Sequence, residues 1–253
     1  MHKSLVLHQI DIDDIAAMER WYYLQHSAEI ARRYGPWLRR HESWMPVPVP
    51  EEATEYGFFN WRFTQTYWYE EPLPGPRGEL AFTPPPVPLV RCASTHIPAQ
   101  CTEDFKGHQL LPYEKETLRW VQFIRFPDNV AKEKADSWYV NVMAPAICSH
   151  DKMHRFFSSR TISVASGLPG VWRECDRSKL KSGKDRQWDR VTEMWFESFR
   201  DWRDFVRNTP KVELPEWAEQ SAFPYLTCGN NFISTFIVEQ PTNDFLEEKR
   251  VYL

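Results

Sequence analysis

His26 and Tyr22 are the residue pair in this chain best suited to moving a proton. They lie four residues apart in the stretch WYYLQHSAEI. On a helix this spacing brings a phenol and an imidazole within one turn of each other. Imidazole is the side chain whose ordinary pKa is closest to neutral pH. His26 is therefore a candidate general base and Tyr22 a candidate hydrogen-bonding partner, with a packed helix histidine as the structural alternative.

A carboxylate on a later predicted strand is a candidate to work with this pair. Alternation in VTEMWFE places Glu193 on the same strand face as Trp195. A carboxylate that faces a cavity loses hydration, which raises its pKa and lets it act as an acid or a base. We therefore treat Glu193 as a candidate catalytic residue, and an ion pair with an arginine is the alternative.

Aromatic and imidazole side chains on the strands are candidates for substrate binding. In FTQTYWYEE the alternation puts Trp68 on one face and Tyr67 on the other, and Trp68 matches Trp195 in the later strand. His96, in CASTHIP, shares a face with Cys92. Aromatic walls suit an aromatic ligand. Tyr67, Trp68, Trp195 and His96 are the predicted substrate-binding residues.

Patterns for metals and nucleotides are weak in this sequence. His150 and His154 have the helical i, i+4 spacing but no clear third ligand and no glutamate of an HExxH motif. Cys92 and His96 resemble a nucleophile and base, although buried cysteines commonly serve as small apolar residues. The chain has nine Gly and no glycine-rich phosphate loop. We expect neither a metal nor a cofactor.

Composition restricts the kinds of partner that we expect and the cellular compartment in which we expect the protein. Aromatic residues make up 15% of the 253 residues, which is typical of a protein with an ordered core. A net charge of −4 argues against nucleic acid as the main partner. No run of 18 apolar residues and no signal-peptide pattern occurs, so we expect a cytoplasmic protein without a membrane partner. The five Cys lack a CxxC pair and are expected to be free thiols.

A long-range repeat organises the chain. WYYLQHSAEI from Trp21 is similar to WYVNVMAPAI from Trp138, an offset of 138 − 21 = 117 residues, which sets Met143 opposite His26. Weaker matches align Trp68 with Trp195 and Cys92 with Cys228. This period is too long for a solenoid and predicts two domain-sized units, residues 1–112 and 113–253.

The elements that must position these residues can be predicted from periodicity. SLVLHQI predicts a strand, and a helix capped by Asp13 or Asp14 then continues to about Tyr34, where Gly35 and Pro36 end it. Strands are expected across LRRHESWMPV, FFNWRFTQTYWYE and 89–97. The proline-rich stretch PLPGPRGELAFTPPPVP replaces a second helix.

The second unit is more regular and defines the fold class. LRWVQFIRF, a helix over about 129–143, SSRTISV, DRVTEMWFE, the helix SFRDWRDFV and NNFISTFIVE follow each other in the order β-α-β-β-α-β. This order is typical of a ferredoxin-like domain, with helices on one sheet face. Two such sheets can close face to face. We therefore predict an α+β fold of two tandem ferredoxin-like repeats that form a barrel within one chain, with a cavity between the sheets.

These motifs resemble a known family. A strand, a helix ending in W-x-x-x-x-H-(S/A) and a strand of the type VTEMWFESF are similar to the dimeric α+β barrel superfamily, particularly its EthD-like branch. The resemblance implies a hydrophobic pocket with one histidine at the helix end, which is His26 here. Met143 departs from the pattern, so the resemblance implies one working site.

The leading functional hypothesis is a cofactor-independent lyase that dehydrates a small hydroxylated aromatic compound or cleaves it by a retro-aldol step. His26 would take the proton, Tyr22 or Tyr67 would bind the oxyanion, and Glu193 would orient or reprotonate. An isomerase would use the same groups. A cofactor-free monooxygenase, a haem-binding barrel with His26, His150 or His154 as ligand, and a non-catalytic binding protein are the competing hypotheses. Whether two chains form a homodimer is left open.

Overall fold

The computed structural model describes residues 2–56, 59–68, 83–107, 117–161, 188–238 and 241–246. Within these ranges the strands form two five-stranded antiparallel sheets. The first sheet has the order β10-β2-β3-β1-β4 and the second β5-β7-β8-β6-β9. The first consists of β1 (His2–Gln9), β2 (Leu38–Trp44), β3 (Arg62–Trp68), β4 (Arg91–Ile97) and β10 (Asn243–Asp244). The second consists of β5 (Thr102–Lys106), β6 (Leu118–Ile124), β7 (Met153–Arg160), β8 (Arg190–Phe196) and β9 (Phe232–Val238).

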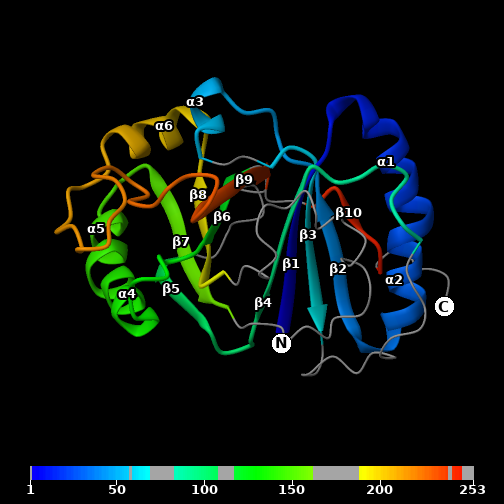
Figure 1. Cartoon of the computed structure of the whole chain (residues 1–253), viewed down its shortest axis with the longest axis horizontal. Coiled ribbons are helices and arrows are strands. Elements are labelled where there is room, and N and C mark those ends of the chain that lie inside the picture. Colours follow the sequence, from blue (N-terminus) through cyan, green and yellow to red (C-terminus); the bar gives the residue numbers. More distant parts are fainter. Residues whose placement is uncertain are drawn as a thin grey trace.

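The helices lie on the outer faces of the two sheets, and the sheets face each other (Figure 1). Alpha helices α1 (Ile15–Trp21) and α2 (Ser27–Tyr34) cover the first sheet. The second is covered by α4 (Lys132–Trp138), α5 (Ala144–Cys148) and α6 (Phe199–Arg207). A short helix α3 (Glu51–Thr54) lies near α6. The protein is therefore an α+β fold, as its periodicity predicts.

Each long helix contains a π-helical turn at the same point. Tyr22–His26 joins α1 to α2, and Tyr139–Met143 joins α4 to α5. A π turn widens the helix by one residue and frequently occurs at functional sites. The first helix is preceded by the 3-10 turn Ile12–Asp14, where the Asp11 side chain accepts a hydrogen bond from the Asp13 amide. The α-helix itself begins at Ile15 with Asp14 at its N-cap position, as predicted, although the Asp14 side chain makes no capping hydrogen bond. The predicted end at Tyr34 is confirmed.

An apolar cluster fills part of the space between the sheets. Leu5, Leu7 and Phe63 of the first sheet pack against Val121 and Phe123 of the second, together with other buried residues of both sheets. The predicted cavity between the sheets is thus occupied by side chains where this cluster lies. The apolar residues of this cluster recur at every second position of β1 and β6, which is the period of a strand.

The edge strands are exchanged between the two halves of the chain. β5, which follows β4 in sequence, pairs with β7 of the second sheet. β10, which follows β9, pairs with β2 of the first sheet. Each sheet therefore has an edge strand supplied by the other half of the chain, and the sequence patterns predicted neither strand.

Most of the predicted elements are present, with shifted bounds. The strand predicted at SSRTISV begins earlier, at Met153, and the helix predicted at about 129–143 runs from Lys132 to Cys148. The boundary predicted at 112/113 and most of the proline-rich stretch lie outside the described residues, and residues 83–90 contain neither helix nor strand.

Candidate functional site

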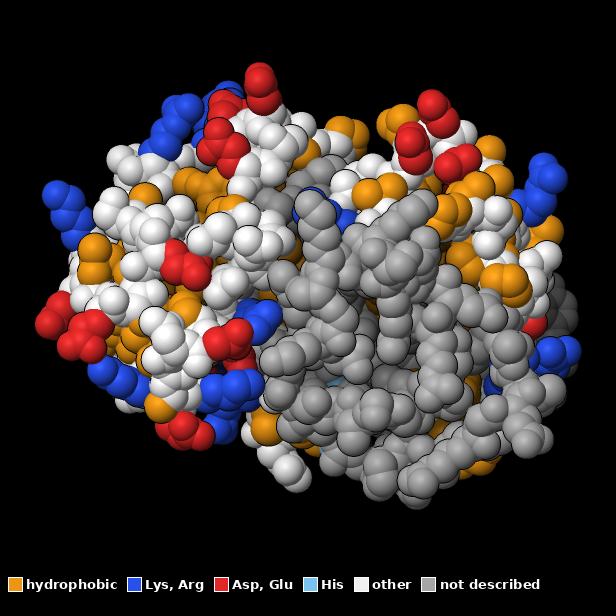
Figure 2. Space-filling model, in the orientation of Figure 1, with side chains coloured by type: hydrophobic (Ala, Val, Ile, Leu, Met, Phe, Trp, Pro, Cys, Tyr) orange, Lys and Arg blue, Asp and Glu red, His pale blue; other side chains and the backbone are white. Residues whose placement is uncertain are grey.

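The helix-facing side of the first sheet carries an unusual concentration of buried polar side chains. The π turn places Tyr22 and His26 over this face, β1 supplies His8, β2 supplies His41 and β3 supplies Thr66. None of these five residues is more than 7% exposed. We call these five residues the His26 site. The surface shows no comparable concentration of charge in the view of Figure 2, where acidic and basic side chains are interspersed around the described part of the face.

His26 is held between aromatic rings. Its imidazole stacks on Trp21 at 4.7 Å between ring centroids and lies 5.6 Å from the Tyr22 ring. Trp21 is itself fixed by a 2.9 Å hydrogen bond from its indole nitrogen to the carbonyl oxygen of Thr83. His26 is 4% exposed, so the predicted candidate base is buried against the sheet and does not point into solvent.

Tyr22 belongs to a hydrogen-bonded framework beneath the helix. Its hydroxyl lies 2.9 Å from the Thr64 hydroxyl, and the Arg62 guanidinium lies 4.7 Å from the centre of its ring. Arg62 donates to the Ser43 hydroxyl at 3.2 Å and forms an ion pair with Glu19 on α1. The buried positive charge of Arg62 is thus compensated by a carboxylate from the helix above it.

His41 is fully buried and is oriented by its neighbour on β3. Its Nδ1 atom lies 2.9 Å from the Thr66 hydroxyl. Its Nε2 atom has no hydrogen-bond partner among the described residues, although it is shielded from solvent. Phe245, which directly follows β10, covers the site: its ring centroid lies 5.3 Å from that of His41 and 5.7 Å from that of Tyr22.

Burial keeps the three imidazoles neutral at pH 7. Burial lowers the pKa of His26 to about 4, against the opposing effect of Glu29. Burial, reinforced by the nearby charge of His26, lowers the pKa of both His8 and His41 to about 3. The pKa of the Tyr22 hydroxyl is raised by burial. At pH 7 the site therefore presents neutral imidazoles, which can accept protons, and a neutral phenol, which can donate one.

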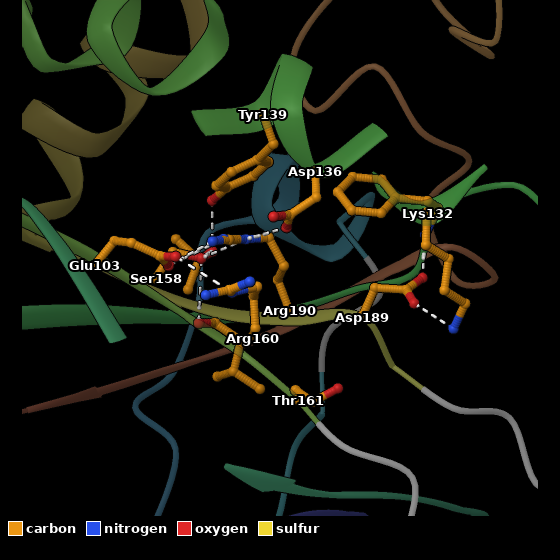
Figure 3. Close-up of polar contacts among 12 residues, drawn as sticks. Glu103, Lys132, Asp136, Tyr139, Ser158, Arg160, Thr161, Asp189 and Arg190 are labelled. Carbon is orange, nitrogen blue, oxygen red and sulfur yellow. Dashed lines mark hydrogen bonds and ion pairs between the residues drawn. The ribbon is translucent and has the colours of Figure 1, made fainter. Parts of the chain in front are cut away.

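The second half of the chain repeats the framework. β6 pairs with β8 and β9 as β1 pairs with β3 and β4, so the pairing registers define corresponding positions. The Tyr139 hydroxyl lies 2.6 Å from the Thr192 hydroxyl, and the Arg190 guanidinium lies 4.7 Å from the centre of the Tyr139 ring. Figure 3 shows Arg190 below Tyr139, with Glu103, Asp136 and Ser158 around it.

The imidazoles are not repeated. The positions that correspond to His8, His41 and His96 hold Ile124, Phe156 and Phe236. Met194 corresponds to Thr66, and Met143 ends the second π turn where His26 ends the first. These second-half residues belong to one buried apolar cluster. The framework is common to both halves, whereas the polar side chains of the His26 site occur only in the first.

The structure separates the predicted site residues into two groups. Trp68 and His96 lie on the same sheet face as the His26 site, where each is within hydrogen-bond distance of the Ser4 hydroxyl at 2.9 Å. Tyr67, Glu193 and Trp195 lie on the opposite faces, between the two sheets. Glu193 therefore does not come together with His26.

Between the sheets, Glu193 is paired with a cation. The Arg119 side chain donates to Oε2 of Glu193 from Nε at 3.0 Å and from Nη2 at 2.5 Å. The Trp195 indole nitrogen also donates to this oxygen, at 3.4 Å. The ion pair with an arginine, and not a free carboxylate, is the arrangement that the structure contains.

The sequence alignment of the strands was off by one residue. Trp68 was matched with Trp195, but the pairing registers set Tyr67 in correspondence with Trp195. A shift of one residue exchanges the two faces of a strand. The error hid the contrast between the two halves, because His8 and His41 are recognisable only when the strands are compared in the correct register. That contrast is the signal by which the sequence could have identified them.

The metal and thiol patterns do not form a site in the described part of the chain. His150 lies between α5 and β7 and packs against Phe205, whereas His154 lies on β7, so they do not share a helix. Among the described residues no group of three or more His, Cys, Asp or Glu is arranged to hold a metal ion. The described cysteines Cys92, Cys101, Cys148 and Cys228 are free thiols. Of the described helices, none has the length and apolar character required to cross a membrane.

Comparison with known proteins gives one family match. Residues 1–83 match the family model of the chalcone isomerase N-terminal domain. This range contains all five residues of the His26 site. No curated protein sequence matches the chain.

Solved structures with a similar chain path have very different sequences. An anthrone oxidase-like protein is 8% identical, with 96% of this chain and 92% of that chain covered and a TM-score of 0.48. A mutant chlorite dismutase from Candidatus Nitrospira defluvii is 10% identical, with 98% and 94% covered and a TM-score of 0.45. Similarity at this level does not transfer a function.

Proposed function

We propose that this protein is a cofactor-independent isomerase that acts by general acid–base catalysis on a small hydroxylated aromatic compound bound at the His26 site. The observation that carries the proposal is the contrast between the halves. The same Tyr, Thr and Arg framework supports polar side chains in the first half and apolar ones in the second. Burying several imidazoles costs free energy that an apolar core avoids. A function at this site explains their presence.

The family match supports isomerisation in preference to the lyase step expected from the sequence. The matched family is named for an isomerase, and the matched range includes the whole site. Both reactions would use the same side chains. An isomerisation moves a proton from one substrate atom to another and needs no further reactant, which suits a buried site made of neutral imidazoles.

In the proposed reaction, His26 takes a proton from a substrate hydroxyl or activated carbon and then returns it to a different carbon. The imidazolium and the substrate anion form together as an ion pair in a site with little water, where their attraction is strong. The stacking of His26 on Trp21 fixes the plane of the imidazole. Trp21, Tyr22 and Phe245 supply aromatic surface for the ring of the substrate.

The proposal extends to the organisation of the chain. We infer that residues 1–112 and 113–253 are tandem ferredoxin-like copies that close into a barrel of the EthD-like type, and that only the first copy keeps a site. Matching strand registers, the paired π turns and the exchange of β5 and β10 support this. Even the irregularity in β2 between Leu38 and Arg40 has a counterpart in β7 between Met153 and Arg155.

The test is turnover of a hydroxylated chalcone, followed by the loss of its absorbance and by the mass of the product. An unchanged mass identifies an isomerase, a released aldehyde identifies a lyase, and oxygen consumption identifies a monooxygenase. His26→Met, which introduces the residue found at position 143, is expected to lower kcat/KM by about 10²- to 10⁴-fold. Met143→Leu is the matched control and should keep full activity. Full activity of the His26→Met variant would contradict the proposal.

A further inference from the structure

We propose that His41 is a second functional group of the His26 site, and that its Nε2–H donates a hydrogen bond to a substrate oxygen. This inference rests on the proposed function, because it assigns a role in the same site. No sequence motif singles out His41, and the family match, which spans residues 1–83, does not distinguish it from its neighbours. His41 is fully buried, has one oriented hydrogen bond and lies beside the other residues of the site.

The two ring nitrogens of His41 differ in their surroundings. Nδ1 of His41 lies 2.9 Å from the Thr66 hydroxyl, whereas Nε2 is buried and has no hydrogen-bond partner among the described residues. A buried polar atom without a partner is unfavourable, so such atoms are rare unless a water or a ligand binds them. Nε2 of His41 is therefore a ready position for a ligand atom.

The Thr66 hydroxyl determines the tautomer of His41. A threonine hydroxyl can donate a hydrogen bond to Nδ1. When Thr66 donates, the proton of the neutral imidazole resides on Nε2, which then becomes a donor. The imidazole stays neutral because it is fully buried and lies near His26. A neutral imidazole donor can polarise a carbonyl or phenolic oxygen without transferring its proton.

His41 is joined to His26 through a group of aromatic rings. Phe245 contacts both His41 and Tyr22, and Tyr22 contacts His26, so these rings form one continuous group. Thr66 and His41 are paired across β2 and β3. The corresponding pair in the second half is Phe156 and Met194, neither of which can form such a hydrogen bond. The oriented imidazole is thus specific to the half that contains His26.

In this proposal His26 and His41 have different roles in the reaction. His26 moves the proton, and His41 stabilises the negative charge that develops on the substrate oxygen as the proton leaves. Preorganised donors of this type contribute strongly in sites from which water is excluded. The ligand class is an aromatic compound with a carbonyl or phenolic oxygen in conjugation with its ring.

The experiment uses the full chain and 4-hydroxyacetophenone labelled with ¹³C at the carbonyl as the probe. Infrared spectroscopy measures the carbonyl stretch of the bound probe, and tryptophan fluorescence measures its affinity. Binding to the wild-type protein is expected to lower the stretching frequency. His41→Phe, which introduces the residue of position 156, should abolish the shift and weaken binding at least tenfold. His41→Gln keeps an N–H donor near the place of Nε2 and should restore part of the shift.

Further measurements on the wild-type protein and on His26→Met distinguish a failure of this inference from a failure of the proposed function. His26→Met should keep the carbonyl shift although turnover of a hydroxylated chalcone is lost. A wild-type protein that shows the shift without turnover would contradict the isomerase proposal and leave the role of His41 supported. ¹⁵N NMR of the ligand-free protein should show the proton of His41 on Nε2. A proton on Nδ1, failure of the probe to bind, or an unchanged shift in His41→Phe would each overturn the inference.

Discussion

At the scale of single residues, the comparison of the two halves separates side chains that maintain the fold from side chains that act in the reaction. Tyr22 and Tyr139 make the same contacts with a threonine and an arginine, although only one of them lies beside a histidine. Shared contacts favour a structural role for the Tyr22 hydroxyl. The difference between His26 and Met143, at equal positions in equal π turns, has no such structural explanation.

Paired tyrosine substitutions test this distinction. Tyr22→Phe and Tyr139→Phe each remove one buried hydrogen bond to a threonine hydroxyl, and each is expected to lower the free energy of unfolding by about 1 kcal/mol. Urea denaturation of both variants measures this. Because the hydroxyl serves the framework, Tyr22→Phe should retain most of the kcat/KM that His26→Met loses. A loss of 10²-fold or more in Tyr22→Phe alone would assign its hydroxyl to the reaction instead.

At the scale of elements, the exchanged edge strands connect the end of the chain to the site near its beginning. The Phe245 amide donates to the His41 carbonyl at 3.0 Å, and the Phe245 ring covers His41 and Tyr22. In the second half, Phe105 of β5 covers Phe156 in the same way, at 4.9 Å. The site residues are almost fully buried, so a ligand reaches them only when a covering side chain moves.

Removal of the covering ring tests this access route. Phe245→Ala is expected to speed the modification of His41 by diethyl pyrocarbonate at pH 6 at least tenfold, because the neutral imidazole then becomes accessible. Peptide mass spectrometry measures the rate at each histidine. Phe105→Ala is the matched control: it removes a similar apolar area, at a cost of about 1–3 kcal/mol, but should leave the labelling of His41 unchanged. Equal labelling in both variants would argue against Phe245 as the cover.

At the scale of the whole molecule, the buried imidazoles make stability depend on pH. The folded protein holds His8, His26 and His41 at pKa values of about 3, 4 and 3, whereas the ordinary value is 6.5. Between pH 6.5 and 4 the unfolded chain therefore binds up to three more protons at these sites than the folded chain does. The contribution of the three neutral imidazoles to the free energy of unfolding is fully present above pH 7. It decreases as the pH falls from 6.5 to 4.

The expected loss is large enough to measure. Each histidine contributes almost 2 kcal/mol between pH 7 and pH 5, so the three together lower the free energy of unfolding by about 6 kcal/mol. Urea denaturation at pH 7, 6 and 5 gives this dependence. The double variant His8→Ile, His41→Phe, built from the residues of the second half, should show only about a third of the loss. An equally steep dependence in the variant would place the origin in other groups.

The sequence alone predicted much of this protein. Hydrophobic periodicity predicted most of the strands and helices, because period two and period 3.6 reflect local geometry. The repeat of Trp21 at Trp138 identified His26 as the position where the two halves differ. Glu193 was also singled out, with an ion pair to an arginine as the alternative to a catalytic role, since a carboxylate on an apolar strand requires a partner.

Only the tertiary structure decided which faces meet and which residues share a site. Both faces of β3 and β8 are buried, so alternation could not tell the helix-facing side from the side between the sheets. The exchange of β5 and β10 depends on pairing between distant segments and has no local signal. His8, His41 and Phe245 join His26 through contacts that span most of the chain. Such contacts are determined by packing, which depends on all the elements together.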